Sequence, residues 1–151
     1  MQQATAPMDW SGLPAGCTRP GPLAARGEAA YVETVSAYAY PAASEFLIQL
    51  ADFQLEPTRR PDLRPTRGRQ RIFQISLGRA RGDRLPKAGP YQRRTRRTAA
   101  LVLHDGDAAP ARVSEEPRVV VTHADKTWVC GTVELPSTGS GKQPFAARIA
   151  R

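Results

Sequence analysis

Apolar and polar residues alternate with a period of two along several short stretches of the chain. The stretch 70–77 has the clearest pattern, because Phe73, Ile75 and Leu77 fall on one face and polar residues on the other. Alternation of this kind predicts half-buried β-strands. Together with short runs rich in β-branched or aromatic residues, it predicts six strands, at residues 31–40, 70–77, 98–104, 118–123, 127–135 and 145–150.

Turn-forming residues separate these strands, and this spacing favours a mainly β fold, a small antiparallel sandwich or barrel. The last two strands flank residues 136–141, which contain Pro136, Gly139 and Gly141. This arrangement predicts a C-terminal hairpin with a loose loop.

Residues 42–55 fit two kinds of secondary structure. Phe46, Leu50 and Phe53 recur at helical spacing, whereas Phe46, Ile48 and Leu50 alternate as in a strand. We favour a strand here. A helix packed on the sheet would instead place the protein in the α+β class.

The N-terminal part of the chain has no clear periodicity. Residues 1–28 contain four prolines and four glycines, which interrupt both strand and helix patterns. The length of 151 residues fits one domain. We therefore predict a flexible tail at 1–28 and a single β domain at 29–151, with Arg-rich loops within residues 56–97. No apolar run approaches the length of a transmembrane helix.

Basic residues are concentrated in one quarter of the sequence. From Arg59 to Arg97, thirteen arginines and Lys87 accompany two acids, a local charge of +12, while the whole chain carries +8. Such a localised field attracts polyanions. Arginine suits this role because its planar fork can make two hydrogen bonds to phosphate or carboxylate. The candidate anion-binding residues are Arg59, Arg60, Arg67, Arg69, Arg71, Arg93, Arg94, Arg96 and Arg97.

The basic segment admits other interpretations. Its two arginine-rich parts flank the predicted strand 70–77 and could form one continuous positive surface, with Tyr91 and Phe73 stacking on nucleic-acid bases if they are exposed. Charged loops can also serve solubility alone. The excess of arginine over lysine, nineteen to three, is also typical of GC-rich coding sequences.

The chain contains two cysteines in different settings. Cys17 lies in the Gly- and Pro-rich N-terminal segment, and Cys130 lies inside a predicted strand. If they pair, the disulfide ties the N-terminal segment to the sheet and suits an oxidising compartment. A buried, inert Cys130 beside an unrelated Cys17 is the alternative.

Three parts of the chain resemble small uncharacterised exported or lipid-anchored bacterial β-domain proteins. The similarity lies in residues 35–40 and 47–52, and in a closing hairpin that joins 131–134 to 144–147. The resemblance implies a β fold and an extracytoplasmic location. It implies no activity, and the arginine-rich middle departs from the pattern.

The chemistry-bearing residues match no dedicated catalytic or metal site. His104 and His123 are each followed by aspartates, but the spacing is that of ordinary turns rather than of a metal site. Cys130 with His123 lacks a recognisable oxyanion hole. We therefore predict no metal site, no cofactor and no enzymatic activity.

The sequence favours a binding protein. We predict a non-catalytic β domain with a binding or structural accessory role in the cell envelope or elsewhere outside the cytoplasm, periplasmic or extracellular. Its basic face would meet an anionic partner: a lipid headgroup, a polysaccharide, a nucleic acid or an acidic protein surface. The alternatives are a cytoplasmic nucleic-acid-binding module and a structural subunit that sits on an acidic partner.

Overall fold

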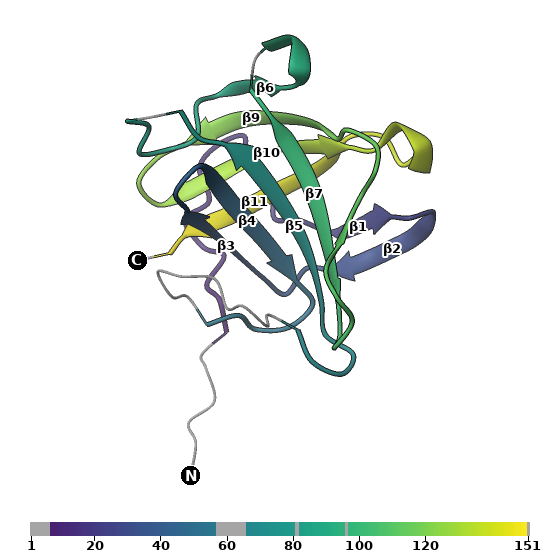
Figure 1. Cartoon of the computed structure of the whole chain (residues 1–151). Coiled ribbons are helices and arrows are strands. Elements are labelled where there is room, and N and C mark those ends of the chain that lie inside the picture. The colour runs from purple at the N-terminus through teal and green to yellow at the C-terminus, as the bar shows by residue number, and fades with distance from the viewer. Residues whose placement is uncertain (1–6, 57–65, 81, 96, 151) are drawn as a thin grey trace.

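Short β-strands connected by loops make up most of the protein (Figure 1). The computed structural model describes residues 7–56, 66–80, 82–95 and 97–150, with the backbone alone at Ala29 and Arg93. The strands are β1 (Pro22–Ala25), β2 (Glu28–Glu33), β3 (Ser36–Pro41), β4 (Glu45–Ala51), β5 (Arg71–Gly78), β6 (Gly89–Tyr91), β7 (Ala99–Asp105), β8 (Ala111–Arg112), β9 (Arg118–Ala124), β10 (Trp128–Glu134) and β11 (Gln143–Ile149). Two 3-10 helices, η1 (Arg93–Thr95) and η2 (Pro136–Thr138), lie in loops.

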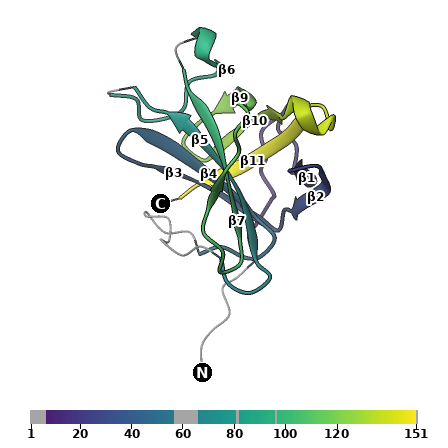
Figure 2. The same ribbon diagram turned by 45° about the vertical axis from the view of Figure 1, so that its right-hand side comes forward.

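Nine strands form one curled sheet in the order β6-β9-β10-β11-β3-β4-β5-β7-β8 (Figures 1 and 2). Its neighbouring strands are antiparallel except β11 and β3, which pair in parallel. β10 and β11 form the predicted C-terminal hairpin, and β1 pairs with β2 in a separate small sheet. The mainly β, barrel- or sandwich-like fold predicted from the sequence is confirmed.

The ambiguous segment 42–55 contains a strand, β4. Phe46, Ile48 and Leu50 point into the core and are at most 3% exposed. β4 is hydrogen-bonded to β3 on one side and to β5 on the other. Pairing on both edges satisfies the backbone groups that a helix would have paired internally. In the described residues, no helix is longer than the three residues of η1 and η2.

The main core lies on the inner face of the curled sheet. Every second residue of β5, namely Phe73, Ile75 and Leu77, is fully buried there, as the alternation predicted. Gly131 in β10 permits close packing, because a Cβ at this position would collide with the carbonyl oxygen of Val120 and touch the ring of Phe145.

The described part of the N-terminal segment covers the outer face of the sheet. Met8 is 7% exposed and packs in a second apolar cluster with Tyr38, Tyr40 and Trp128. The ring of Trp10 stacks on that of Trp128 with a centroid distance of 6.2 Å. Apolar side chains that a sheet leaves exposed on its outer face need a cover, and this segment provides one.

Residues 7–28 therefore differ from the flexible tail expected from their composition. Residues 22–25 form β1, joined to β2 by a two-residue turn in which Arg26 and Gly27 have φ of 54° and 75°. Positive φ at both turn residues is typical of a hairpin, but Asn-Gly rather than Arg-Gly is the usual sequence signal. The stabilising contacts come from residues far along the chain, which local composition does not reveal. Residues 1–6 lie outside the described part.

The β1–β2 hairpin is held against the main sheet by polar contacts. A bulge between Leu23 and Ala25 leaves Ala24 out of the β1–β2 register. The buried Gln143 side chain instead accepts a hydrogen bond from the Ala24 N–H (2.6 Å) and donates one to its carbonyl (3.3 Å). The hydroxyl of Tyr31 in β2 donates to the carbonyl of His104 in β7 (2.9 Å).

Candidate functional site

The described basic residues fall into two groups at opposite ends of β5. Arg67 and Arg69 precede the strand, whereas Arg79 and the residues up to Arg97 follow it. Eight residues of strand span about 25 Å at ~3.3 Å per residue. In Figure 1 the loop with β6 and η1 lies at one end of the molecule, and the chain that enters β5 lies at the other. The described arginines therefore do not form one continuous surface.

Arg59, Arg60 and Arg96 lie outside the described residues, and the side chain of Arg93 is not described. Arg67, Arg69 and Arg94 are exposed, while Arg71 and Arg97 are half-buried.

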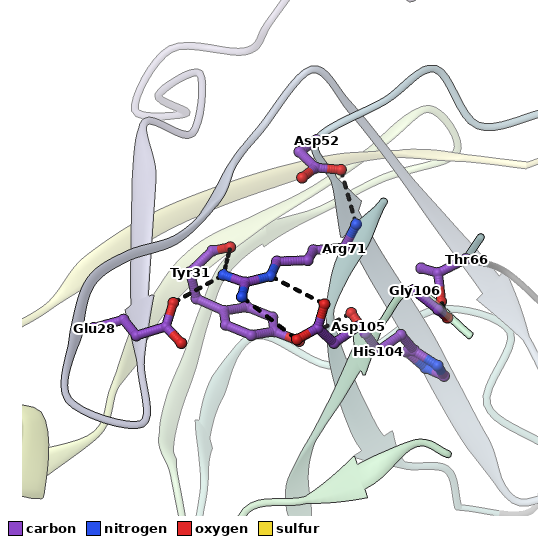
Figure 3. A network of polar contacts seen from close by, with 8 residues as sticks. All are labelled: Glu28, Tyr31, Asp52, Thr66, Arg71, His104, Asp105 and Gly106. Atoms are coloured by element: carbon purple, nitrogen blue, oxygen red, sulfur yellow. Dashed lines mark hydrogen bonds and ion pairs between the residues drawn. The ribbon is translucent and has the colours of Figure 1, made fainter. Parts of the chain in front are cut away.

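Arg71 is engaged by acidic residues of the protein itself (Figure 3). Its guanidinium contacts Glu28 at 2.8 Å and Asp105 at 3.3 Å, and it donates to the carbonyl of Tyr31 at 3.4 Å. The guanidinium also lies 4.8 Å from the centroid of the Tyr31 ring. Two carboxylates neutralise this arginine, so it joins β2, β5 and β7 rather than binding an external anion.

An open cavity of about 650 Å³ lies beside Arg71. It is lined by Arg69 and Arg71 and by three acids, Glu33, Asp52 and Asp105. The Asp52 carboxylate accepts a hydrogen bond from the backbone N–H of Arg71 (2.9 Å; Figure 3). Because its carboxylates outnumber its guanidinium groups, this cavity does not favour anions.

The polar cluster in Figure 3 extends to the neighbouring loop and strand. The hydroxyl of Thr66 donates to the carbonyl of Gly106 (2.6 Å), which ties the chain before β5 to the turn after β7. Burial lowers the pKa of His104, whose Nε2 lies 3.1 Å from the Gln74 side-chain oxygen. These polar groups find their partners within the protein, so we assign the cluster a structural role.

A second cavity, which we call the basic cavity, lies where β5 ends and β7 begins. Its volume is about 290 Å³, and its lining includes Ser44, Arg79, Asp83, Lys87, Arg97 and Thr98. Arg79 directly follows β5, and only Thr98 separates Arg97 from the start of β7. Because β5 and β7 pair in antiparallel orientation, the two arginines lie close to each other and line the same cavity.

Protein groups fix the guanidinium of Arg79 in place. Its Nε donates to the carbonyl of Asp83 (2.8 Å) and its Nη1 to that of Ala42 (2.6 Å). Its central carbon lies 5.4 Å from the centroid of the Phe46 ring. A carbonyl oxygen orients a guanidinium without neutralising it, so Arg79 keeps its positive charge toward the cavity.

Arg97 is oriented in the same way. Its Nη1 donates to the carbonyl of Ala88 (3.1 Å), and its central carbon lies 5.5 Å from the centroid of the Tyr91 ring. Lys87 Nζ lies 3.8 Å from Asp83, the one carboxylate among the lining residues. Within the described residues, neither Arg79 nor Arg97 forms a salt bridge.

The sequence-based candidates included Arg97 but missed Arg79 and Lys87. A usable signal was present, because Arg79 follows one predicted strand and Arg97 precedes the next, and neighbouring antiparallel strands bring such positions together. The proposed stacking residues are not available. Tyr91 is 2% exposed and Phe73 is fully buried.

The two histidines lie on strands that are not neighbours, and the two cysteines are joined to each other. β7 and β9, which carry His104 and His123, are not neighbours in the sheet, and no group of three potential ligands occurs in the described residues. Cys130 forms a disulfide with Cys17, with Cα atoms 5.7 Å apart. Its sulfur is therefore not a free nucleophile.

His123 instead takes part in a turn with Asp125. The two side chains are 2.6 Å apart, and Asp125 also accepts hydrogen bonds from the backbone N–H groups of Thr127 and Trp128. The hydrogen bond with His123, followed by those of Trp128 and Thr127, lowers the pKa of Asp125 to about 2. This aspartate fixes the turn between β9 and β10.

The chain matches no protein-family model, no curated protein and no solved structure. In the part of the chain that the structure describes, no helix is long and apolar enough to cross a membrane.

Proposed function

We propose that the protein is a binding domain that acts outside the cytoplasm and holds an acidic polysaccharide at its basic end. We define the basic end as residues 79–97, which include β6, η1 and most of the lining of the basic cavity. The observation that carries the proposal is the pair of arginines, Arg79 and Arg97, that line one cavity without a carboxylate partner among the described residues.

This segment of the sequence has a high density of positive charge. Residues 79–97 carry seven arginines and Lys87 against Asp83, a net charge of +7, compared with +5 for residues 59–71. Arg84 and Arg94, which belong to the basic end, are exposed to solvent. A single-sign field of this kind raises the local concentration of polyanions and speeds their association.

The neighbouring surface supports a polymer as the partner. A further open cavity of about 400 Å³ shares Ser44, Gly78 and Thr98 with the basic cavity. Its lining also includes Gln74 and Ser76 on the outer face of β5. An extended ligand could therefore place acidic groups at the arginines and hydroxyl groups along these polar side chains.

Other anionic partners are less well supported. Nucleic-acid bases would lack stacking platforms, because Tyr91 is buried beneath Arg97. Insertion into a lipid surface needs exposed apolar side chains, and the one large exposed apolar residue in the described part is Val35, before β3.

The disulfide supports the compartment. Disulfides persist in oxidising environments and are rare in the cytosol. The Cys17–Cys130 bond therefore favours a periplasmic or extracellular location, in agreement with the resemblance drawn from the sequence.

The proposal is tested by measuring the affinity of the protein for labelled alginate at several salt concentrations, up to the physiological value. Duplex DNA and phosphatidylglycerol vesicles serve as comparison ligands. The test variant is Arg84→Gln/Arg94→Gln at the basic end, and the matched control is Arg67→Gln/Arg69→Gln, which removes the same charge at the opposite end of β5. We expect the test variant to bind alginate at least tenfold more weakly and the control variant to bind within about twofold of the wild type.

Equal losses in both variants would mean that only net charge matters and would contradict a site at the basic end. Preferential binding of DNA at physiological salt would favour the alternative of a nucleic-acid-binding module. In that case removal of two phosphate contacts should make the log–log salt slope shallower by about 2.

A further inference from the structure

We infer that the basic cavity is a binding site for one phosphate group, carried either by free inorganic phosphate or by a phosphate ester on a polymer. The inference rests on the proposed function, because it identifies the acidic group that the basic end would recognise. It concerns the cavity residues Arg79, Lys87 and Arg97, whereas the exposed Arg84 and Arg94 supply the general attraction.

The cationic groups of the cavity are already oriented before a ligand arrives. Each guanidinium donates to a backbone carbonyl oxygen and lies over one aromatic ring. The ring is that of Phe46 for Arg79 and that of Tyr91 for Arg97. A free arginine side chain loses conformational entropy when it is immobilised. Much of that loss has occurred on folding, so it does not weaken binding.

The charge of the cavity matches a dianion. Arg79, Lys87 and Arg97 provide three positive charges, and Asp83 provides one negative charge. Lys87 lies 3.8 Å from Asp83 and partly neutralises it. The two guanidinium groups then remain for the ligand. A phosphate monoester or inorganic phosphate carries close to two negative charges at neutral pH, whereas a carboxylate carries one.

The hydrogen-bonding groups and the volume favour a small tetrahedral anion. Ser44 and Thr98 add hydroxyl groups to the lining, on different segments from the arginines. Phosphate has several acceptor oxygens that can meet donors arriving from different sides, and a carboxylate has two in one plane. The cavity volume of about 290 Å³ lies at the lower limit for small-molecule sites, so it fits a single acidic group.

Isothermal titration with inorganic phosphate at constant ionic strength tests this inference. The variant is Arg97→Gln, because the contacts of Arg97 with the described residues are one hydrogen bond to Ala88 and the ring contact with Tyr91, so we expect its replacement to disturb the fold little. The matched control is Arg67→Gln, which removes the same charge from an exposed position at the opposite end of β5. A second variant, Arg79→Lys, retains the charge and removes the planar fork. Near-UV circular dichroism checks that each variant is folded.

We expect the wild type to bind one phosphate saturably, Arg97→Gln and Arg79→Lys to bind at least tenfold more weakly, and Arg67→Gln to remain within about twofold. Acetate should compete at least tenfold more weakly than phosphate, because a carboxylate carries one negative charge. A phosphorylated polysaccharide that binds more tightly than inorganic phosphate would identify a polymer ester as the source. Equal affinities for the polysaccharide and for inorganic phosphate would identify free phosphate as the ligand.

The inference is overturned if phosphate fails to saturate the wild type, or if Arg67→Gln weakens phosphate binding as much as Arg97→Gln does. In those cases the proposed function still stands when alginate binding depends on Arg84 and Arg94. If alginate binding is also independent of these residues, both the inference and the proposed function fail.

Discussion

Arginine residues of one basic segment have different roles, which their partners determine. Arg71 faces two carboxylates and acts as an internal link. Arg79 and Arg97 face carbonyl oxygens and aromatic rings and so retain an uncompensated charge. Arg67 and Arg69 are exposed. The sequence contains thirteen arginines in this segment, and only their partner groups distinguish their roles.

Replacement of Arg71 by methionine should lower the free energy of unfolding by about 1–2 kcal/mol. The change removes two partly exposed ion pairs and a cation–π contact, each of which contributes about 0.5–1 kcal/mol. Urea unfolding at neutral pH measures the effect. The exposed Arg69→Met serves as the control, and an equal loss in the control would contradict the assigned role.

Asp125 should make stability depend on pH in the acid range. Its pKa in the folded protein is about 2 and its ordinary value is 3.8. A lowered folded-state pKa stabilises the protein above the unfolded-state value, and this contribution is lost as the pH falls from about 4 toward 2. Asp125→Asn keeps an acceptor oxygen but not the charge.

The difference in unfolding free energy between the wild type and Asp125→Asn should therefore be constant above about pH 5 and shrink below pH 4. Urea titrations from pH 2 to pH 7 measure it. A difference that stays constant down to pH 2 would show that the ionised form is not preferentially stabilised by folding.

At the scale of elements, pairing partners decided what local patterns left open. The apolar spacing in residues 42–55 fits a helix and a strand, and β4 forms because β3 and β5 hydrogen-bond to both of its edges. The segment 22–25 has a weak local preference and becomes β1 through its pairing with β2. Strands depend on neighbours in this way more than helices do.

Gln143 should be the main polar anchor of the β1–β2 hairpin. In Gln143→Ala the backbone groups of Ala24, which is 5% exposed, lose their partners. An unsatisfied buried backbone group costs about 1–3 kcal/mol. We expect a loss of stability of this size, with faster amide hydrogen exchange in residues 22–33. The exposed neighbour Lys142→Ala should change neither quantity.

At the scale of the whole molecule, the partners of the described arginines differ between the two ends of β5. Glu28 and Asp105 offset Arg71 near the end where the strand begins. At the other end, Arg79 and Arg97 have no carboxylate partner among the described residues. This difference is the basis of the proposed binding mode.

The Cys17–Cys130 disulfide should be the largest single contribution to stability. Its cysteines are 113 residues apart, and closing a loop of about this length stabilises the folded state by about 4–5 kcal/mol in the chain-entropy model. Dithiothreitol should lower the midpoint of urea unfolding of the wild type. Cys17→Ser should already have the lower midpoint and show no further response. A wild-type midpoint that reductant leaves unchanged would contradict the role of the bond.

The sequence alone determined the fold class, the approximate positions of most strands and the charged character of the segment 59–97, because these depend on residue type and local periodicity. The predicted strand 31–40 is an exception, because it is divided between β2 in the small sheet and β3 in the main sheet. The sequence did not determine the role of residues 7–28, whose cover over Tyr38 and Trp128 depends on contacts with distant strands. Nor did it separate Arg71 from Arg79 and Arg97. Only the tertiary structure brings carboxylates to one arginine and carbonyl oxygens to the others, and that difference of partner decides which charges are left for a ligand.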